Sequence, residues 1–287
     1  MSSRRTRLHE ACSAVGSRKL DYSSPSDVRD VTEHRGNLDT MLFNDKFRFI
    51  SAVIFKCGSS NWRRFLMSLA EKQGRITNLP PQLARKQYKP KAPLSFFSKN
   101  QVHELTFRLR HYTKIVTVRH PLIRFLSGYR DKFIEHTDKF RKDIPAKILK
   151  ARSGKVGPRH VTFPEFAGFV TKNNWTRGTD PHWTPQYIRS RPCEHDYDII
   201  VKLETSQDDM AFLQHELGIE KFGTYQKEYE DRHRVSNDKK LIVSFYHQLT
   251  EELFHRVCDY YSLDFMLFGY YRPKSIADVE KIFDDFA

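Results

Sequence analysis

Apolar and polar positions along this chain follow a repeating pattern: a short run of β-branched residues, a turn, and then apolar residues at helical spacing. The pattern is clearest at residues 50–55 followed by 63–70, and at residues 115–118 followed by 122–129. Strands that alternate with helices in this way predict an α/β fold, in which a parallel sheet is flanked by helices. Both turns then lie at the carboxyl edge of the sheet, where ligands of such folds bind.

The remainder of the chain continues the alternation. The first forty residues differ, because they are rich in Ser, Arg and Asp and contain few apolar residues. We therefore predict a loose N-terminal arm over residues 1–40 and one folded domain over residues 41–287. The further elements that we expect are a strand at 197–203, a helix at 207–217, one long amphipathic helix at 238–261 and a short helix at 275–286.

The turn after the first strand has the composition of an anion site. It contains Lys56, Gly58, Ser59 and Ser60, and a helix follows it. Backbone N–H groups at a helix N-terminus, together with a lysine, favour a phosphate or sulfate ligand. The spacing is not that of a Walker loop, because that motif places its lysine after a second glycine. The alternative is a helix start capped by Ser59, Ser60 or Asn61 without a ligand.

A second strand and turn repeat the arrangement downstream. Arg119 follows the strand at residues 115–118, Pro121 suits the first turn of the next helix, and Ser127 lies on that helix. An arginine presents a planar fork that grips phosphate with two hydrogen bonds. The sequence therefore predicts that Arg119 and Ser127 bind a phosphate group at the second strand exit.

Together these segments resemble the Golgi carbohydrate sulfotransferases of the HNK-1 and chondroitin 4-O-sulfotransferase type. Residues 55–64 resemble the 5′-phosphosulfate loop of that family, P-K-V-G-C-T-N-W-K-R, and residues 118–133 resemble its 3′-phosphate motif, V-R-x-P-x-x-R-L-x-S-x-Y-R-x-K-F. Residues 182–204 and 264–270 also agree in order, so the resemblance spans about residues 48–272. The chain departs from the family pattern at Phe55, Ser59, Ser60 and, where the family has the first cysteine of C-x-P-C, Ser190.

The resemblance implies a P-loop-like sulfotransferase fold, with residues 41–287 as the catalytic domain, and the donor 3′-phosphoadenosine 5′-phosphosulfate. The sulfuryl group of this donor would move to a sugar hydroxyl without a metal ion. Such a transfer depends on positioning and fixed positive charge. Lys56 would neutralise the bridging oxygen, and Arg119 and Ser127 would hold the 3′-phosphate. The donor-binding residues expected around the 5′-phosphate are Lys56, Cys57, Gly58, Ser59, Ser60, Asn61, Trp62 and Arg63, the last two as supports of the loop.

The acceptor hydroxyl needs a general base, and His182 is the first candidate. It aligns with a histidine-tryptophan pair of the family, and an imidazole titrates near neutral pH. The alternative is that His182 only hydrogen-bonds a loop. Weaker candidates for the base or for ligand contact are His103, Glu104, His111, His233 and Arg234.

The net charge of the chain is +14, with a pI of about 9.6, and this balance favours anionic partners. Residues 85–114 and 141–159 carry eight and seven Lys or Arg residues and one acidic residue each. For the second run, a solvated loop without a ligand is the alternative. Zinc-finger spacing and RNP-type aromatic motifs are absent from the sequence, which disfavours nucleic acid. We expect an acidic glycosaminoglycan acceptor, first of all chondroitin or dermatan N-acetylgalactosamine at its 4-hydroxyl.

Three alternatives to that function stay open. A terminal glucuronic acid, as on HNK-1-type glycans, is a second acceptor class. A catalytically inactive relative that binds acidic glycans or nucleic acid is a competing class, although a 3′-phosphate clamp at Arg119 has no use there. A nucleotide kinase is disfavoured by the absent Walker spacing.

The four cysteines, Cys12, Cys57, Cys193 and Cys258, form no metal-binding pattern. Cys57 lacks an adjacent base, so we expect it to pack rather than to act as a nucleophile. Residues 174–176 form a glycosylation sequon. The family carries an N-terminal membrane anchor, yet no apolar run near the ~18 residues of a membrane span occurs in this sequence. Residence in the Golgi lumen or at the Golgi membrane is therefore an expectation from the resemblance, with the sequon in mild support.

Overall fold

The computed structural model describes residues 1–33, 41–69, 95–96, 102–135, 143–152, 160–172, 180–221 and 238–286. The chain forms two compact units. The first unit comprises Met1–Arg119, Gln186–Arg232 and Met266–Gly269, and the second comprises His120–Pro185, His233–Phe265 and Tyr270–Ala287.

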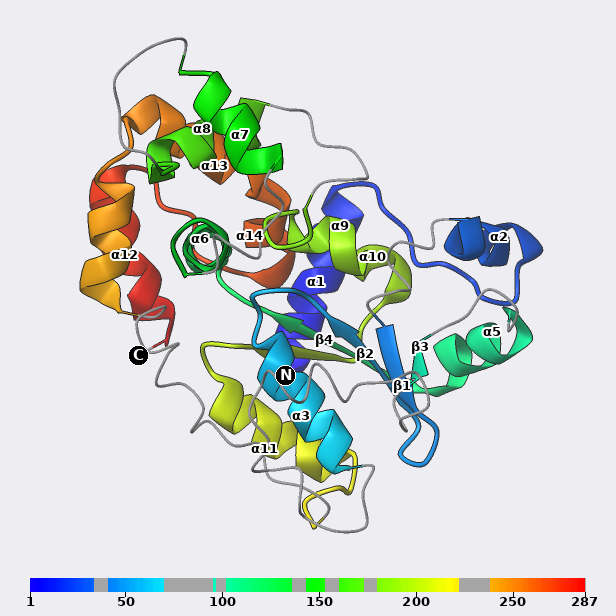
Figure 1. Cartoon of the computed structure of the whole chain (residues 1–287). Coiled ribbons are helices and arrows are strands. Elements are labelled where there is room, and N and C mark those ends of the chain that lie inside the picture. Colours follow the sequence, from blue (N-terminus) through cyan, green and yellow to red (C-terminus); the bar gives the residue numbers. More distant parts are fainter. Residues whose placement is uncertain are drawn as a thin grey trace. The chain divides into compact units, whose positions relative to one another are not determined.

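A five-stranded sheet lies in the first unit, in the order β3-β1-β2-β4-β5 (Figure 1). The central strands β2 (Phe49–Val53), β4 (Thr113–Val118) and β5 (Ile199–Lys202) are parallel, with Ile50 opposite Lys114 and Val116 opposite Ile200. Strand β1 (Met41–Asn44) runs antiparallel to β2 and to the short β3 (Ser95–Phe96). The predicted α/β class with a parallel sheet is confirmed for the strands that carry the two turns, and the antiparallel hairpin extends that sheet.

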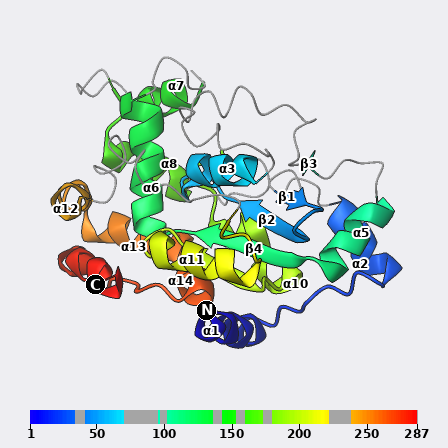
Figure 2. The same ribbon diagram turned by 90° about the horizontal axis from the view of Figure 1, so that it is seen from below.

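Apolar side chains of two helices that are far apart in sequence cover one face of this sheet. Helix α3 (Ser59–Ser68) contributes Trp62 and Phe65, and helix α11 (Ser206–Glu216) contributes Met210 and Leu213, to one cluster with residues of β1, β2, β4 and β5. Both views show α3 beside β2 (Figure 1, Figure 2). The helix α5 (Val102–His111) precedes β4, and α9 (Gln186–Ser190) and α10 (Pro192–His195) precede β5.

The N-terminal residues are not a loose arm, and this part of the prediction is wrong for residues 1–33. Helix α1 (Ser2–Ala14) lies beside α10 and β5, and its few apolar residues share one buried side, with Leu8 fully buried. A disulfide joins Cys12 to Cys193, and a second helix, α2 (Pro25–Glu33), follows. Helix α1 contains few apolar residues, so the hydrophobicity pattern did not predict it. Charged side chains hold most of this helix in place.

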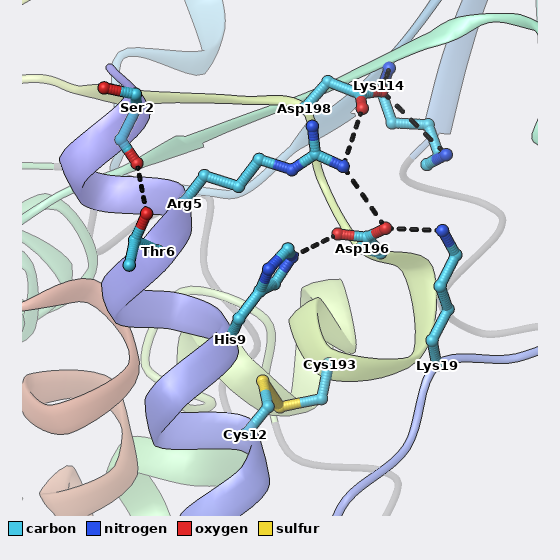
Figure 3. Close-up of polar contacts among 10 residues, drawn as sticks. All are labelled: Ser2, Arg5, Thr6, His9, Cys12, Lys19, Lys114, Cys193, Asp196 and Asp198. Carbon is cyan, nitrogen blue, oxygen red and sulfur yellow. Dashed lines mark hydrogen bonds and ion pairs between the residues drawn. A yellow bond between two sulfur atoms is a disulfide. The ribbon is translucent and has the colours of Figure 1, made fainter.

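Asp196 is the centre of those charged contacts (Figure 3). Its carboxylate accepts hydrogen bonds from Lys19 Nζ at 2.6 Å, His9 Nε2 at 2.7 Å and Arg5 Nη2 at 3.4 Å. Burial alone would raise the pKa of Asp196, but these donors together hold it at about 2.

Ser190 stands at the position of the family's first C-x-P-C cysteine. Its hydroxyl donates a hydrogen bond to the Gln186 carbonyl oxygen.

The second unit is helical and has an aromatic core. Helix α6 (Pro121–Tyr129) is buried along its whole length, and aromatic rings from α6, α8 (Phe163–Lys172) and α12 (Lys239–Tyr246) contact one another. The remaining elements are η3 (Arg130–Glu135), α7 (Asp143–Lys150), α13 (Glu251–Tyr260), α14 (Ser262–Phe268, which continues into the first unit) and the 3₁₀ helix η7 (Ile276–Phe286).

The predicted long helix over residues 238–261 is wrong in one respect, because it is two helices. Helix α12 ends at Tyr246, and α13 begins after Thr250, whose Oγ1 accepts a hydrogen bond from Leu253 N at 3.2 Å. The N-cap Thr250, followed by Glu251 and Glu252, is a start signal within an otherwise continuous apolar stripe.

Candidate active site

The loop between β2 and α3, residues 54–58, has an unusual backbone. Both Lys56 and Gly58 adopt left-handed conformations, with φ of 68° and 71°. A lysine pays strain in this region, of about 1–2 kcal/mol, and such strain collects at functional sites. The backbone turns at once into α3, whose first hydrogen bond runs from Trp62 N to Gly58 O at 3.0 Å. We call residues 54–58 the Lys56 loop.

Gly58 is required by its surroundings as well as by its backbone. A Cβ atom at this position would lie 2.7 Å from Leu203 Cδ1, in the turn after β5. The Lys56 loop therefore packs directly against the end of a strand distant in sequence. The first N–H groups of α3, at Ser59, Ser60 and Asn61, have no acceptor within the helix and are the natural donors to an anion.

The other residues expected around the 5′-phosphate divide into two groups. Trp62 is 2% exposed, and its indole N–H donates to Ser51 Oγ, so it is a core residue that fixes α3 on the sheet. The Arg63 guanidinium lies over the Phe55 ring, 5.9 Å from its centre, at the start of the loop. Trp62 thus fixes the helix that follows the loop, and Arg63 packs at the start of the loop.

Arg119 lies next to the Lys56 loop. It follows β4, is 5% exposed, and its Nη1 donates to the Lys56 carbonyl oxygen at 3.2 Å. The two sequence motifs thus meet at the carboxyl edge of parallel strands, as their placement after β2 and β4 predicts. The Arg119 guanidinium, the strained Lys56 and the start of α3 therefore lie close together in the first unit.

Gln186 joins these two segments, and sequence reasoning missed it. Its Oε1 accepts hydrogen bonds from Arg119 N at 2.8 Å and from Cys57 Sγ at 3.1 Å, while its Nε2 donates to Arg119 O at 2.8 Å. The side chain is fully buried. Cys57 is buried, lies outside any disulfide and packs in this network.

Ser127 and His182 lie in the second unit. Ser127 is on α6 and is 5% exposed. The neighbouring Gly128 faces the His182 backbone so closely that a Cβ atom would lie 3.0 Å from the His182 carbonyl oxygen. Arg124, also on α6, donates to Thr184 O at 2.8 Å and to Pro181 O at 3.0 Å. The helix that carries Ser127 is therefore fastened to the segment that carries His182.

Asp180 fixes the tautomer of His182. Its Nδ1 lies 2.5 Å from Asp180 Oδ1, and because a carboxylate can only accept, Nδ1 carries the proton and Nε2 is the basic nitrogen. Burial lowers the pKa of His182 from its usual 6.5, and Asp180 opposes that shift. The ring is therefore neutral at pH 7 and able to take a proton.

The weaker candidates for the base lie at the other end of β4 from Arg119. His103, Glu104 and His111 are on α5, which leads into the amino end of this six-residue strand, about 20 Å along the sheet. A cavity of ≈ 310 Å³ there is lined by Asp45, His103, Glu104, Phe107, Arg108 and Tyr112. Their distance within the first unit separates them from Arg119 and the Lys56 loop.

Several expectations fall outside the described residues. They concern His233 and Arg234, the sequon at 174–176, residues 34–40 of the arm, and those parts of the basic runs at 85–94, 97–101, 141–142 and 153–159. Among the residues that the structure describes, no group of three or more His, Cys, Asp or Glu side chains could hold a metal ion. No helix within the described ranges is long and apolar enough to cross a membrane.

A family model described as "Sulfotransferase family" matches residues 39–271. The chain belongs to the sulfotransferase family. This confirms the family and the class of sulfate-transferring enzymes that the sequence predicts, and the match includes the Lys56 loop, Arg119, Ser127, His182 and Gln186.

Curated relatives of this sulfotransferase are carbohydrate sulfotransferases. Carbohydrate sulfotransferase 14 of Danio rerio is 28% identical over 276 residues, which cover 93% of this chain and 71% of the relative. Carbohydrate sulfotransferase 10 of Xenopus laevis is 29% identical, covering 93% and 75%. Carbohydrate sulfotransferase 8 of Mus musculus is 28% identical, and the chain spans 63% of its length. No solved structure matches the chain significantly.

Proposed function

We propose that this sulfotransferase moves the sulfuryl group of 3′-phosphoadenosine 5′-phosphosulfate to a hydroxyl group of a sugar. The contact between Arg119 Nη1 and the Lys56 carbonyl carries the proposal, because it joins the two segments that we propose as phosphate-binding motifs. A donor with phosphates on both its 5′ and 3′ sides suits two such motifs. The names of the relatives support a carbohydrate acceptor.

The donor's 5′ side fits the Lys56 loop. The N–H groups and hydroxyls at Gly58, Ser59, Ser60 and Asn61 would bind the 5′-phosphate, and Lys56 would neutralise the oxygen that bridges phosphorus and sulfur. Arg119 and Ser127 would hold the 3′-phosphate. Cys57, Trp62 and Arg63 would support these contacts without reacting.

The reaction balances with one base. The acceptor hydroxyl oxygen forms a bond to sulfur as the bond between sulfur and the bridging oxygen breaks, and 3′-phosphoadenosine 5′-phosphate leaves. His182 Nε2 would take the hydroxyl proton, because Asp180 holds the other ring nitrogen protonated. The step requires neither an oxidant nor a metal ion.

For the acceptor, we propose N-acetylgalactosamine at the 4-hydroxyl in chondroitin or dermatan. The net charge of +14 favours a polyanionic chain over a neutral one. A terminal glucuronic acid is the second acceptor. The Cys12–Cys193 disulfide supports the proposal that the enzyme works in the Golgi lumen, because disulfides persist in oxidising compartments. Attachment to the Golgi membrane is proposed from the family alone.

The test is transfer of radiolabelled sulfate from the donor to desulfated chondroitin, dermatan, heparosan and glucuronyl-terminated acceptors, with nucleotide binding measured by calorimetry. We expect transfer to chondroitin or dermatan, and the Lys56→Ala variant as its control should bind nucleotide without transfer. Transfer only to the glucuronyl-terminated acceptor would replace the proposed substrate. Folded protein that binds glycan but not the nucleotide would favour the inactive glycan-binding relative.

A further inference from the structure

Asp209, at the start of α11, organises the turn that follows β5. Its Oδ2 accepts hydrogen bonds from Lys202 N at 2.8 Å and from Thr205 Oγ1 at 3.0 Å, and from Arg4 on α1. The Asp209 side chain is only 8% exposed. Buried, charge-assisted hydrogen bonds of this kind fix geometry more firmly than surface ion pairs do.

Arg4 reaches the same turn from the N-terminal helix. Besides Asp209, its Nη1 donates to the Ile200 carbonyl at 2.9 Å and its Nη2 to Thr205 Oγ1 at 3.1 Å. One guanidinium therefore braces both the last strand of the sheet and the turn after it. Arg4 and Ile200 are 196 positions apart in the sequence, so no local pattern predicts this contact.

The turn between β5 and α11 packs against the Lys56 loop. Leu203 lies between Lys202 and Thr205, and its Cδ1 lies 2.7 Å from where a Cβ of Gly58 would be. Its backbone N–H donates to Val118 O at 2.9 Å, one residue before Arg119. A shift of Leu203 would thus be felt at both proposed phosphate sites of the first unit.

Helix α1 has two further anchors. The Cys12–Cys193 disulfide holds its C-terminal half to α10. At its other half, Arg7 packs on Gly269, where a Cβ would lie 2.5 Å from Arg7 Cδ, and the Gly269 carbonyl accepts from Lys202 Nζ at 3.0 Å. Lys202 precedes Leu203, so α1 contacts the β5 exit along two routes.

We infer that α1 is a positioning element for the donor: Arg4, through Asp209 and Leu203, holds the Lys56 loop in its nucleotide-binding conformation. Arg4, Asp209 and Leu203 touch neither donor nor acceptor in this scheme, so they are positioning residues. The inference rests on the proposed function in one respect, namely that the Lys56 loop binds the donor nucleotide. Coupling between α1 and the loop does not require that function.

The chain offers a matched control on the same helix. Arg5 neighbours Arg4 and makes ion pairs with Asp196 at 3.4 Å and Asp198 at 3.3 Å, two residues that precede β5 rather than following it. Arg4→Gln and Asp209→Asn should speed backbone amide exchange in residues 54–60 and weaken 3′-phosphoadenosine 5′-phosphate binding about fivefold or more. Arg5→Gln should change neither, and Arg4→Lys should restore part of the affinity.

Amide exchange is measured by mass spectrometry without nucleotide, affinity by calorimetry, and melting temperature on every variant. Unchanged exchange and unchanged affinity in Arg4→Gln would overturn the inference, as would equal effects of Arg4→Gln and Arg5→Gln at equal loss of melting temperature. If exchange responds only to Arg4→Gln and Asp209→Asn while wild-type protein binds no nucleotide, the coupling stands and the proposed function fails.

Discussion

The side-chain amide of Gln186 pairs with both backbone polar groups of Arg119, accepting from its N–H and donating to its carbonyl, each at 2.8 Å. A buried amide that satisfies both groups of another residue works as a template for that residue's backbone. It fixes the point from which the Arg119 side chain extends toward the Lys56 loop.

Replacing Gln186 by Met keeps the volume of the side chain and removes all of these hydrogen bonds. We expect the free energy of unfolding to fall by about 1–3 kcal/mol, because buried backbone groups lose their partners, and nucleotide binding to weaken. Urea unfolding and calorimetry measure the two effects. Gln214→Met on α11, a half-buried glutamine, is the control. A Gln186→Met variant with wild-type stability and affinity would contradict the template role.

Two substitutions of Lys56 distinguish its proposed catalytic role from the strain of its backbone. Lys56→Ala should reduce kcat about 100- to 1,000-fold with nearly unchanged nucleotide affinity, since the charge acts on the leaving oxygen in the transition state. Lys56→Gly should be equally inactive, yet more stable than Lys56→Ala by about 1 kcal/mol, because glycine adopts a φ of 68° without strain.

Initial rates and urea unfolding on the two variants separate these effects, with the exposed Lys46→Ala as the control. Retained turnover in Lys56→Ala would remove the lysine from the mechanism. Equal stability of the alanine and glycine variants would argue against strain in the loop.

His182 sets the expected pH dependence of catalysis. Burial lowers its pKa below 6.5, so the base is active at neutral pH and is lost only as the pH falls through this lowered value. The pH profile of kcat/KM should therefore show an acidic limb with an apparent pKa below 6.5. Asp180→Asn removes the group that raises the pKa of His182, and should move the limb to still lower pH while reducing kcat.

His182→Ala should lose the acidic limb and most of the turnover, about 100-fold or more. His247→Ala, on the turn after α12, serves as the control histidine. Near-normal turnover of His182→Ala across the pH range would mean that His182 only hydrogen-bonds its loop.

The same shift has a consequence for folding. Because the unfolded chain binds a proton at His182 more readily than the folded one, this residue's contribution to stability is complete above pH 6.5 and declines as the pH falls toward the lowered pKa. Stability and kcat/KM thus both fall as the pH falls. Thermal melting of His182→Ala at acidic and neutral pH distinguishes the effect on stability from the effect on catalysis.

The Cys12–Cys193 disulfide should contribute about 2–5 kcal/mol to stability, since it closes a long loop in the unfolded chain. The Cys12→Ser/Cys193→Ser double variant should unfold at lower urea concentration, and reductant should lower the midpoint of the wild-type protein but not that of the double variant. Identical midpoints of wild-type protein with and without reductant would contradict a stabilising role. Cys258→Ser is the control for removal of a buried, free cysteine.

Local pattern predicted those parts of the fold and site that local physics decides. The apolar runs located β2 and β4, and the residues after them located Lys56 and Arg119, because strand exits of a parallel sheet share one edge. Gln186, Asp209 and Leu203 act through contacts with residues far away in sequence, and no spacing reveals such contacts. Helix α1 was missed because charged side chains, one buried leucine and a disulfide, rather than an apolar stripe, hold it.

The disulfide also changes the covalent topology of the molecule. Its sequence separation is 181 residues, and Lys56, Arg119, Ser127, His182 and Gln186 all lie between its two cysteines. Every residue proposed to act on the donor or the acceptor therefore belongs to one macrocycle. A single cut of the backbone anywhere inside that ring leaves one molecule, whose pieces separate only when the sulfur–sulfur bond is reduced.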